Sequence, residues 1–525
     1  MEFEGSSILF ENFGTGLTWV LGMSFGLAFI MGAVANKTNF CTMGAVSDYI
    51  NIGDTGRWRA WLFAMVVAII GVIVLEKFNI FGVSSTGLTA LDSESKPPYR
   101  NLNFRVGNYI IGGLLFGIGM TFGSGCGNKT LVRIGGGNIK SIFVLFIMGI
   151  FAYWMILGFG SSVLGNYPPF AWINNLSFAM RPGQDIGSIT AAVSSAPVLG
   201  LWDWSALGSA VVVLLFVLVT GNIINRPEKI LALVLALAVI AGISLWYMKL
   251  AITAIDMRLY IGGTLAFLLL IYILKSKHFT TSFDNILGGL VVGLCVVGMW
   301  YVNGSSKVNA FHAFDEETAK VSLAHYVKKN NWKDNYQVSE SDRTEKTDKP
   351  FIRPDEANRH VGAQGMTFVS PSAWMWNMII GTSTGKKSKI DGKKQPFSAF
   401  LNVPIMLLFG IIAGSFIWAL LSRSFRFEWF ASFKDFLSHS IGAIMMGVGG
   451  VMALGCTVGQ GVTGVSTLAL GSFVTLASIY MGAALSMKIQ LYKMVYEEAG
   501  FGTILVTSLA DMKLLPKSMK KLEAI

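Results

Sequence analysis

Uncharged apolar runs recur along the whole sequence, and they constrain the fold more than any other feature. Each has about 17 to 25 residues, the length that a helix needs to cross the hydrocarbon layer of a bilayer. Only 14% of the residues are charged, against about a quarter in soluble domains. We therefore expect an all-α polytopic membrane protein with about eleven transmembrane helices. They are predicted at residues 16–35, 60–77, 108–125, 141–159, 203–222, 230–248, 259–275, 284–302, 397–421, 437–455 and 466–487.

Basic residues between these runs predict the orientation of the chain. If every apolar run crosses the membrane, most of the basic residues fall on one side of it. The positive-inside rule predicts that this side is cytoplasmic. The N-terminus is then outside and the lysine-rich C-terminus is cytoplasmic. The net charge of +11 is dispersed among loops rather than gathered on one face, so we expect no nucleic-acid partner. The basic residues on the cytoplasmic side are Arg57, Arg59, Lys129, Arg133, Lys140, Arg226, Lys229, Lys275, Lys277, Arg423, Arg426, Lys434, Lys513, Lys517, Lys520 and Lys521.

Composition and motifs divide the chain into four segments, of which the first and last are expected to be pseudo-symmetric membrane halves. The third is charged and polar, so it is predicted to be an extracytoplasmic loop or cap. The segments are 1–160 with Cys41 and Cys126, 161–302 with an outer loop and additional transmembrane spans, 303–396 with the polar loop, and 397–525 with Cys456 and the cytoplasmic tail.

Two features are predicted to lie at the membrane interface. The piece MTFVSPSAWMWNMII, which starts at Met366, is rich in Trp and Met, as a helix of the aromatic belt would be. It could instead form a hairpin with the chain from Leu401 onward. Glu76 is an acidic residue at the end of an apolar run, where an interfacial position is expected.

The stretch from Ser440 to Leu468 combines glycines with an apolar composition. Interior glycine costs a helix about 1 kcal/mol relative to alanine, so this density needs a structural purpose. In a membrane, irregular backbone is tolerated only where protein buries it or where it lines a polar cavity. The stretch is therefore predicted to be a broken or re-entrant helix that places Cys456 on a pathway.

The same design occurs before two other cysteines. A glycine stands nine positions before each of the three, at Gly32, Gly117 and Gly447. Cys126 and Cys456 share further glycines at fourteen, seven and one positions before the cysteine. Internal similarity of broken, glycine-rich helices indicates the midplane site of a transporter. Cys41, Cys126 and Cys456 are therefore the predicted substrate pathway.

The context of the fourth cysteine and the spacing of all four bear on whether the cysteines carry redox or metal chemistry. Cys295 lies in a continuous apolar run, where free cysteine behaves as a small hydrophobe, so we expect it to pack in the core. No CxxC pair occurs and no histidine is near the other three cysteines, so neither a dithiol redox motif nor a zinc site is supported. No metal and no cofactor are predicted.

A neutral thiol suits a soft, sulfur-bearing anion, because its sulfur is polarizable and its S–H is only a weak donor. Lys129 and Arg133 could supply positive charge on one helix face, or they could be anchors at the cytoplasmic mouth. The neutral polar residues near the thiols could contact the solute or bind backbone groups freed by the breaks. They are Asn39, Asn128, Thr457, Gln460 and Thr463.

Three motifs carry a resemblance to a known family. NFCTMGA at 39–45, GMTFGSGCGNKTLVRIGGG at 119–137 and GVMALGCTVGQGVTGVSTLALGS at 450–472 resemble the cysteine motifs of the YeeE/YedE family of sulfur-compound transporters. The resemblance implies an hourglass-like inner-membrane protein that takes up thiosulfate or a related sulfur anion. It also implies that the three matching cysteines pass the ion along. Small cytoplasmic sulfurtransferase-like proteins are the partners that it implies.

Two other classes of function remain open from the sequence. In the first, a cysteine such as Cys126, close in sequence to Lys129 and Arg133, forms a persulfide and passes sulfur to a cytoplasmic partner. In the second, the protein is an assembly component whose cysteines only pack. The resemblance favours the transporter, with transient hydrogen bonds between the thiols and the ion, over both.

Overall fold

The computed structural model of the protein describes the membrane helices and parts of their connections. The described residues are 2–4, 7–10, 13–78, 99, 103–157, 173, 178–179, 254–311, 318–322, 365–386, 394, 396–512 and 514–523. Predicted helices 203–222 and 230–248 lie outside the described residues.

Within these ranges, eight helical segments are long and apolar enough to span a membrane. They confirm eight of the predicted spans and the all-α polytopic class. The predicted span 259–275 is helix α12, Ala254–Leu274, with a shorter apolar part from Arg258 to Leu274. The spanning helices are α1 Phe13–Lys37, α3 Gly56–Lys77, α4 Val106–Phe122 continued by α5 Gly127–Gly135, α6 Ile139–Leu157, α14 Phe283–Ser305, α19 Val403–Leu421, α20 Phe433–Met452 and α21 Leu470–Val495.

Helix α19 begins later than the predicted 397–421 because local capping fixes its start. The side chain of Asn402 accepts a hydrogen bond from the backbone N–H of Ile405 at 3.1 Å. Pro404 occupies the first turn, where its missing N–H would have had no partner within the helix. Residues Phe397–Phe400 form a separate 3₁₀ turn.

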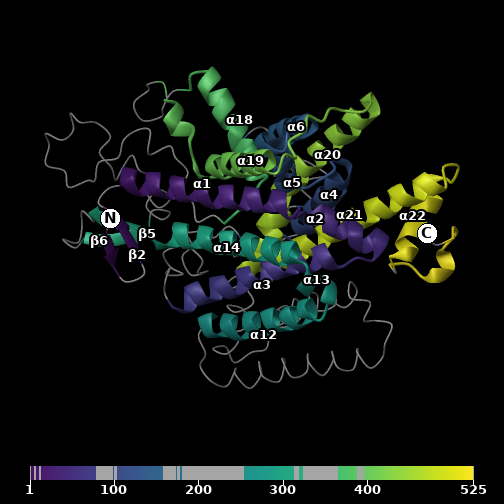
Figure 1. The fold of residues 1–525 in the computed structure, drawn as a ribbon, viewed down its shortest axis with the longest axis horizontal. Coiled ribbons are helices and arrows are strands. Elements are labelled where there is room, and N and C mark those ends of the chain that lie inside the picture. Colours follow the sequence, from purple (N-terminus) through teal and green to yellow (C-terminus); the bar gives the residue numbers. More distant parts are fainter. Residues whose placement is uncertain are drawn as a thin grey trace.

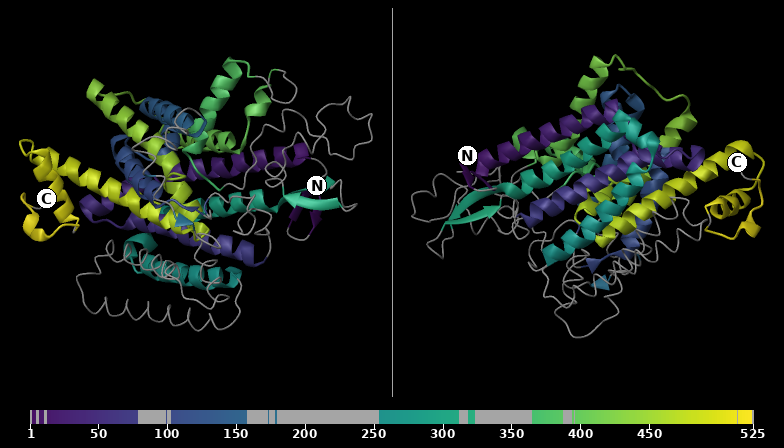
Figure 2. Two further views of the ribbon diagram at one scale, coloured as in Figure 1. Left: turned by 180° about the vertical axis from the view of Figure 1, so that it is seen from behind. Right: turned by 60° about the horizontal axis from the view of Figure 1, so that its bottom comes forward.

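The two chain ends lie at opposite ends of the molecule (Figures 1 and 2). At the N-terminal end, a four-stranded sheet has the order β1-β2-β5-β6, with β2 and β5 parallel and the other pairs antiparallel. The sheet joins the N-terminus to the segment that follows α14. At the other end, α22, Phe501–Asp511, lies near the C-terminus. The strands are β1 Glu2–Glu4, β2 Ser7–Phe10, β5 Ser306–Phe311 and β6 Thr318–Ser322.

Helices α4 and α20 cross at the glycines that the sequence repeat aligns. A Cβ added at Gly112 would lie 2.9 Å from the carbonyl oxygen of Gly449, and one at Gly119 would lie 2.8 Å from that of Gly442. Gly112, fourteen residues before Cys126, therefore contacts Gly449, seven residues before Cys456. Gly442, fourteen residues before Cys456, likewise contacts Gly119, seven residues before Cys126. Only glycine permits this close backbone approach. The crossing therefore has an approximate two-fold symmetry that relates α4, which precedes Cys126, to α20, which precedes Cys456.

Neighbouring helices also pack across the two related parts of the chain. Helix α4, which precedes Cys126, packs on α21, and α20, which precedes Cys456, packs on α6. Helix α1, which precedes Cys41, packs on α19, and α14 packs on α3. Each break is therefore held by helices from a distant part of the chain.

Glu76 lies at the end of α3, but its side chain does not face the surroundings of the protein. Its side chain is buried and forms an ion pair with the equally buried Arg258 of α12 at 3.4 Å. A carboxylate removed from water needs a paired charge, and Arg258 provides it. The pair joins α12 to the end of α3.

Candidate substrate pathway

The three predicted pathway cysteines follow breaks that share one backbone conformation. Two residues before each cysteine, the chain adopts the left-handed region, with φ of 51° at Asn39, 57° at Ser124 and 60° at Leu454. Residues other than glycine rarely adopt this backbone conformation, and it is least favourable for a bulky residue such as Leu454. Strained backbone of this kind clusters at functional sites.

The hydrogen bonds around the breaks also match. The residue after each left-handed position donates its N–H to a carbonyl five residues earlier, which is the closing bond of a Schellman helix end. Each cysteine carbonyl then accepts from the N–H four residues later, which starts a new helix. The closing bonds are Phe40 to Ala35 at 3.1 Å, Gly125 to Met120 at 2.9 Å and Gly455 to Gly450 at 2.8 Å, and the starting bonds are Ala45 to Cys41 at 2.9 Å, Thr130 to Cys126 at 2.9 Å and Gln460 to Cys456 at 2.8 Å.

Two of the thiol sulfurs serve as caps of these new helices. The backbone N–H of Gly44 donates to Cys41 Sγ at 3.3 Å, and that of Gly459 donates to Cys456 Sγ at 3.3 Å. Sulfur here takes the place of the side-chain oxygen of a usual N-cap residue. Cys126 is the N-cap residue of α5, but its side chain makes no capping hydrogen bond. The new helices are α2, Thr42–Ser47, then α5, and the π-helix Gly459–Gly464.

The breaks bring the three cysteines into one neighbourhood. Cys126 is close enough to interact electrostatically with both Cys41 and Cys456. All three sulfur-bearing side chains are buried, and none of them forms a disulfide. Cys295 lies in the continuous helix α14, buried among core side chains. The spatial grouping is that of a central Cys126 with a cysteine from each of two other breaks.

Lys129 joins two of these breaks. Its ammonium donates to the side-chain oxygen of Asn39, the left-handed residue before Cys41. It also interacts electrostatically with Cys41 and Cys126. This position favours the substrate-related interpretation of Lys129 over that of a cytoplasmic anchor.

Arg133 and two polar residues of the Cys456 motif brace the backbone. The Nη1 of Arg133 donates to the carbonyl of Ser124 at 2.5 Å. The amide of Gln460 donates to the carbonyl of Ala453 at 2.5 Å and accepts from Ser472 at 2.6 Å. These side chains therefore satisfy carbonyl groups that the breaks leave without helical partners.

Asn128 and Thr457 are different, because polar atoms of both are buried without a partner among the described residues. The atoms are Asn128 Oδ1 and Thr457 Oγ1. The Thr457 hydroxyl lies beside the Cys126 sulfur without forming a hydrogen bond of acceptable geometry. Buried polar groups almost always have partners, so each of these two atoms has hydrogen-bonding capacity that the described residues leave unused.

Sequence reasoning missed a further segment that covers Cys456. The predicted belt helix or hairpin at Met366 is wrong in its first residues, because Met366 and Phe368 are completely buried. Thr367 Oγ1 lies 4.0 Å from Cys456 Sγ, and Thr463 donates to the carbonyl of Met366 at 2.8 Å. The helix α18, Ser370–Ser383, follows.

One sequence signal could have located this segment. The tetrapeptide GMTF at 119–122 recurs at 365–368, although the two copies lie in different local structures. Tyr99 is a second missed residue, buried near Cys456 and 6.4 Å from the Trp300 ring.

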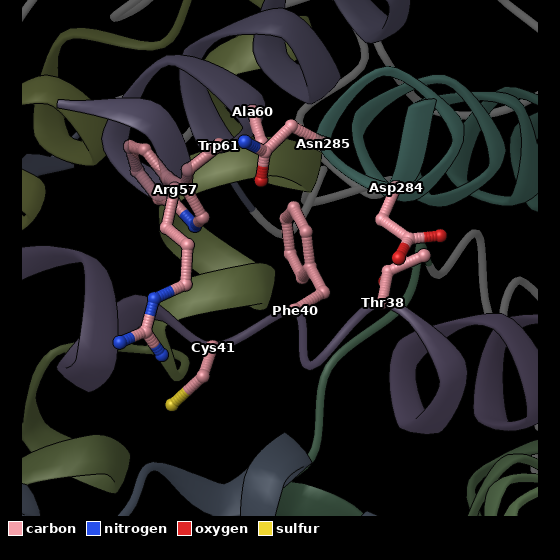
Figure 3. A pocket seen from close by; sticks show the side chains of 8 residues that line it. All are labelled: Thr38, Phe40, Cys41, Arg57, Ala60, Trp61, Asp284 and Asn285. Carbon is pink, nitrogen blue, oxygen red and sulfur yellow. The ribbon is translucent and has the colours of Figure 1, made fainter. Parts of the chain in front are cut away.

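A small pocket opens beside Cys41 (Figure 3). It lies where α1 ends and α3 and α14 begin, on the side of the molecule away from the N-terminal sheet. Its lining combines aromatic, charged and amide side chains. They are Thr38, Phe40, Cys41, Arg57, Ala60, Trp61, Asp284 and Asn285.

Membrane-spanning helices interrupted at buried thiols, with unpartnered polar atoms beside them, define a multi-pass membrane transport protein. The chain belongs to the sulphur transport family, whose sequence profile matches residues 37–339 and 352–485. The predicted resemblance to YeeE/YedE transporters is thereby confirmed, and sulfur-compound transport is the activity of the class.

The chain is also similar to the thiosulfate transporter TsuA of Spirochaeta thermophila. The two are 24% identical over 193 residues, which are 37% of this chain and 51% of that protein. The chain thus matches about half the length of this relative.

Proposed function

We propose that the protein takes up thiosulfate, or a closely related sulfur anion, across a bacterial inner membrane. The ion passes between Cys456, Cys126 and Cys41 by transient hydrogen bonds. The observation that carries the proposal is the nearness of Cys126 to both other cysteines, each of which follows a helix break of the same backbone conformation. The name of the relative TsuA supports thiosulfate as the ion.

The chemistry of the pathway fits an ion that must bind and leave. A neutral thiol is a weak donor that offers a polarizable sulfur and adds no repulsion to a dianion. Conduction requires moderate binding at several sites rather than tight binding at one. Lys129 supplies positive charge between Cys41 and Cys126 and is itself held by Asn39.

The order of the three sites follows from their surroundings. Cys456 lies next to Thr367 and Tyr99, and Tyr99 packs on Trp300 near the end of α14 that leads into the N-terminal sheet. Cys41 borders the pocket on the opposite side. With the N-terminus outside and the C-terminus cytoplasmic, as the basic loops predict, the ion meets Cys456 first and Cys41 last.

The position of Lys129 favours one second candidate function, a membrane sulfurtransferase. A cation next to Cys126 stabilises its thiolate, which can attack the outer sulfur of thiosulfate. A cysteine persulfide forms, the S–S bond of thiosulfate breaks, and sulfite leaves with the bonding electron pair. A small cytoplasmic sulfurtransferase-like partner, docked at the basic C-terminal end, would accept the sulfur.

Transport of differently labelled thiosulfate into proteoliposomes tests the proposal and separates it from the alternative. One sample carries the label on the outer sulfur and the other on the inner sulfur. We expect both labels to accumulate inside at equal rates, because the intact ion crosses. Retention of the outer label by the protein, with the inner label released as sulfite, would support the sulfurtransferase. Absence of uptake with either label would refute both.

A further inference from the structure

The pocket beside Cys41 contains hydrogen-bond donors that the three-cysteine pathway does not use. Cys41, Arg57 and Trp61 lie on one side of the Phe40 ring, and Thr38 and Asp284 lie on the other (Figure 3). The carboxylate of Asp284 repels an anion, so the half that contains Cys41 is the half suited to one.

Arg57 is fixed so that one of its nitrogen atoms stays available. Its Nε and Nη2 donate to the two carboxylate oxygens of Asp48, at 2.5 and 2.6 Å. Its Nη1 lies against Gly44, in the first turn after Cys41, and donates to no acceptor among the described residues. A side chain at position 44 would occupy the space of this nitrogen. The bidentate pair therefore aims a fixed N–H donor toward the Cys41 turn.

Trp61 provides a second donor and an independent indication of a ligand. The residue is only 1% exposed, and its Nε1 has no hydrogen-bond partner in the described part of the chain. Its ring packs against Gly461, which belongs to the break that follows Cys456. A buried indole N–H usually finds an acceptor, so this donor, in a residue that lines the pocket, lacks its expected partner.

Lys129 adds charge at the same place. It interacts electrostatically with Arg57 as well as with Cys41. Two cationic side chains from different helices therefore converge near one cysteine, although the charge of Arg57 is compensated by Asp48. Such an arrangement draws an anion toward the pocket and then offers it N–H donors.

The pocket has room for about one water molecule, which is less than a thiosulfate ion needs. Phe40 lies between its two halves, directly before Cys41 in the chain. An ion that occupies the donor half must therefore displace this ring, whose backbone belongs to the break itself.

We propose that Arg57 Nη1 and Trp61 Nε1 form an exit subsite for the oxygen end of the sulfur anion. Thiols suit the sulfur end of thiosulfate, and N–H groups suit its sulfonate oxygens. An ion at Cys41 thus has its sulfur at the thiol and its oxygens at these two donors before it leaves. The subsite rests on the proposed transport of a sulfur oxyanion and identifies which residues bind the oxygens.

Initial rates of thiosulfate uptake into proteoliposomes test the subsite with Arg57→Gln and Trp61→Phe. Phe keeps an aromatic ring but is three heavy atoms smaller than Trp and lacks the N–H, so kcat is compared per folded protein in W61F as in R57Q. We expect kcat per folded protein to fall about tenfold in R57Q and about threefold in W61F, in line with the loss of one hydrogen bond each. KM measured from outside stays near the wild-type value, because the first binding steps lie at Cys456. The matched control is Lys434→Gln, an exposed cation on the same side, which is expected to transport normally.

The outcomes separate the subsite from the proposed function. Wild-type uptake together with unchanged kcat in W61F and in folded R57Q would overturn the subsite and leave thiosulfate transport standing. A raised outside KM with unchanged kcat would also overturn it, because that pattern belongs to the first binding step. Wild-type protein that takes up no thiosulfate would overturn both.

Discussion

At the scale of single residues, the cysteines have two roles that a substitution can separate. The sulfurs of Cys41 and Cys456 cap the helices after their breaks, and we propose that all three sulfurs bind the ion. Serine keeps a capping group but replaces soft sulfur with a harder oxygen.

We therefore expect Cys41→Ser, Cys126→Ser and Cys456→Ser to lower thiosulfate uptake by about tenfold or more while the amount of folded protein stays close to wild type. Alanine at the same positions should lower both quantities. Cys295→Ala is the control, and its uptake should be nearly normal. Uptake per folded protein, measured in proteoliposomes, would contradict the relay if C295A were inactive and C456S were active.

The two threonines of the Cys456 motif allow a second comparison. Thr463 donates to Met366, whereas the Thr457 hydroxyl has no partner among the described residues. Thr457→Val should lower uptake severalfold and leave the melting temperature unchanged or higher, because it removes a buried hydroxyl that no described residue satisfies. Thr463→Val should lower stability by about 1 kcal/mol, because the Met366 carbonyl loses its donor. The reverse pattern in thermal melts and uptake assays would refute these roles.

Sequence reasoning predicted part of the candidate site at this scale. Cys41, Cys126 and Cys456 stood out through their glycine context, and Thr457 through its position. The patterns could not separate Arg133, which braces a carbonyl, from Lys129, which faces the cysteines, because both are cations four residues apart on one helix. Thr367, Tyr99 and Trp61 were missed because their role depends on contacts with distant segments.

At the scale of elements, the crossing of α4 and α20 depends on close backbone contact. A Cβ at Gly112 or Gly449 would lie less than 3 Å from backbone atoms of the other helix. We expect Gly112→Ala and Gly449→Ala to destabilise the folded protein by about 1 to 3 kcal/mol, because the helices must separate. Gly22→Ala in α1, where nothing lies within 4 Å, should be neutral or slightly stabilising. Thermal unfolding in detergent measures the difference, and equal effects at all three positions would argue against the crossing.

Lys129 and Arg133, which lie on the same helix α5, are expected to differ in the effect of their substitution. Arg133→Gln removes the donor to the Ser124 carbonyl and should reduce the amount of folded protein. Lys129→Gln removes charge beside two cysteines and should reduce uptake about tenfold with little loss of folded protein. Fluorescence-detected size-exclusion chromatography combined with uptake assays gives both quantities. Equal losses of uptake per folded protein would mean that both residues act alike.

At the scale of the whole molecule, apolar run length predicted the described spanning helices, and the glycine repeat indicated the two related halves. The predicted helix boundaries differ from those in the structure where a capping residue fixes the end of a helix. Asn402, which caps the start of α19, is an example. The parallel pairing of β2 with β5 could not be predicted, because it joins strands almost 300 residues apart. The covering of Cys456 by residues 365–369 was hidden for the same reason.

The C-terminal end should respond to pH through Asp511. Burial raises the pKa of this carboxyl, but its bonds to Lys520 and Tyr492 and the charge of Lys488 prevail and lower it. The bond to Asp511, 2.6 Å long, raises the pKa of Lys520. The pair therefore stabilises the fold between the ordinary values of about 3.9 for Asp and 10.4 for Lys. This stabilisation is lost as pH falls through the lowered Asp511 pKa, or rises through the raised Lys520 pKa.

Limited proteolysis of the C-terminal segment measures this dependence. Cleavage after α22 should be slow near pH 7 and faster at pH 11, and Asp511→Asn should be cleaved quickly at both. A protection profile that D511N leaves unchanged would show that the pair does not hold the segment.

The parallel pairing of β2 with β5 also bears on how the protein is made. Strand β2 is synthesised well before its partner, because the residues it pairs with begin at Ser306. It must therefore wait until the helix α14, which directly precedes β5, has been made. The small sheet can therefore close only late in biogenesis, and a nascent chain arrested before residue 306 would leave β2 without this partner.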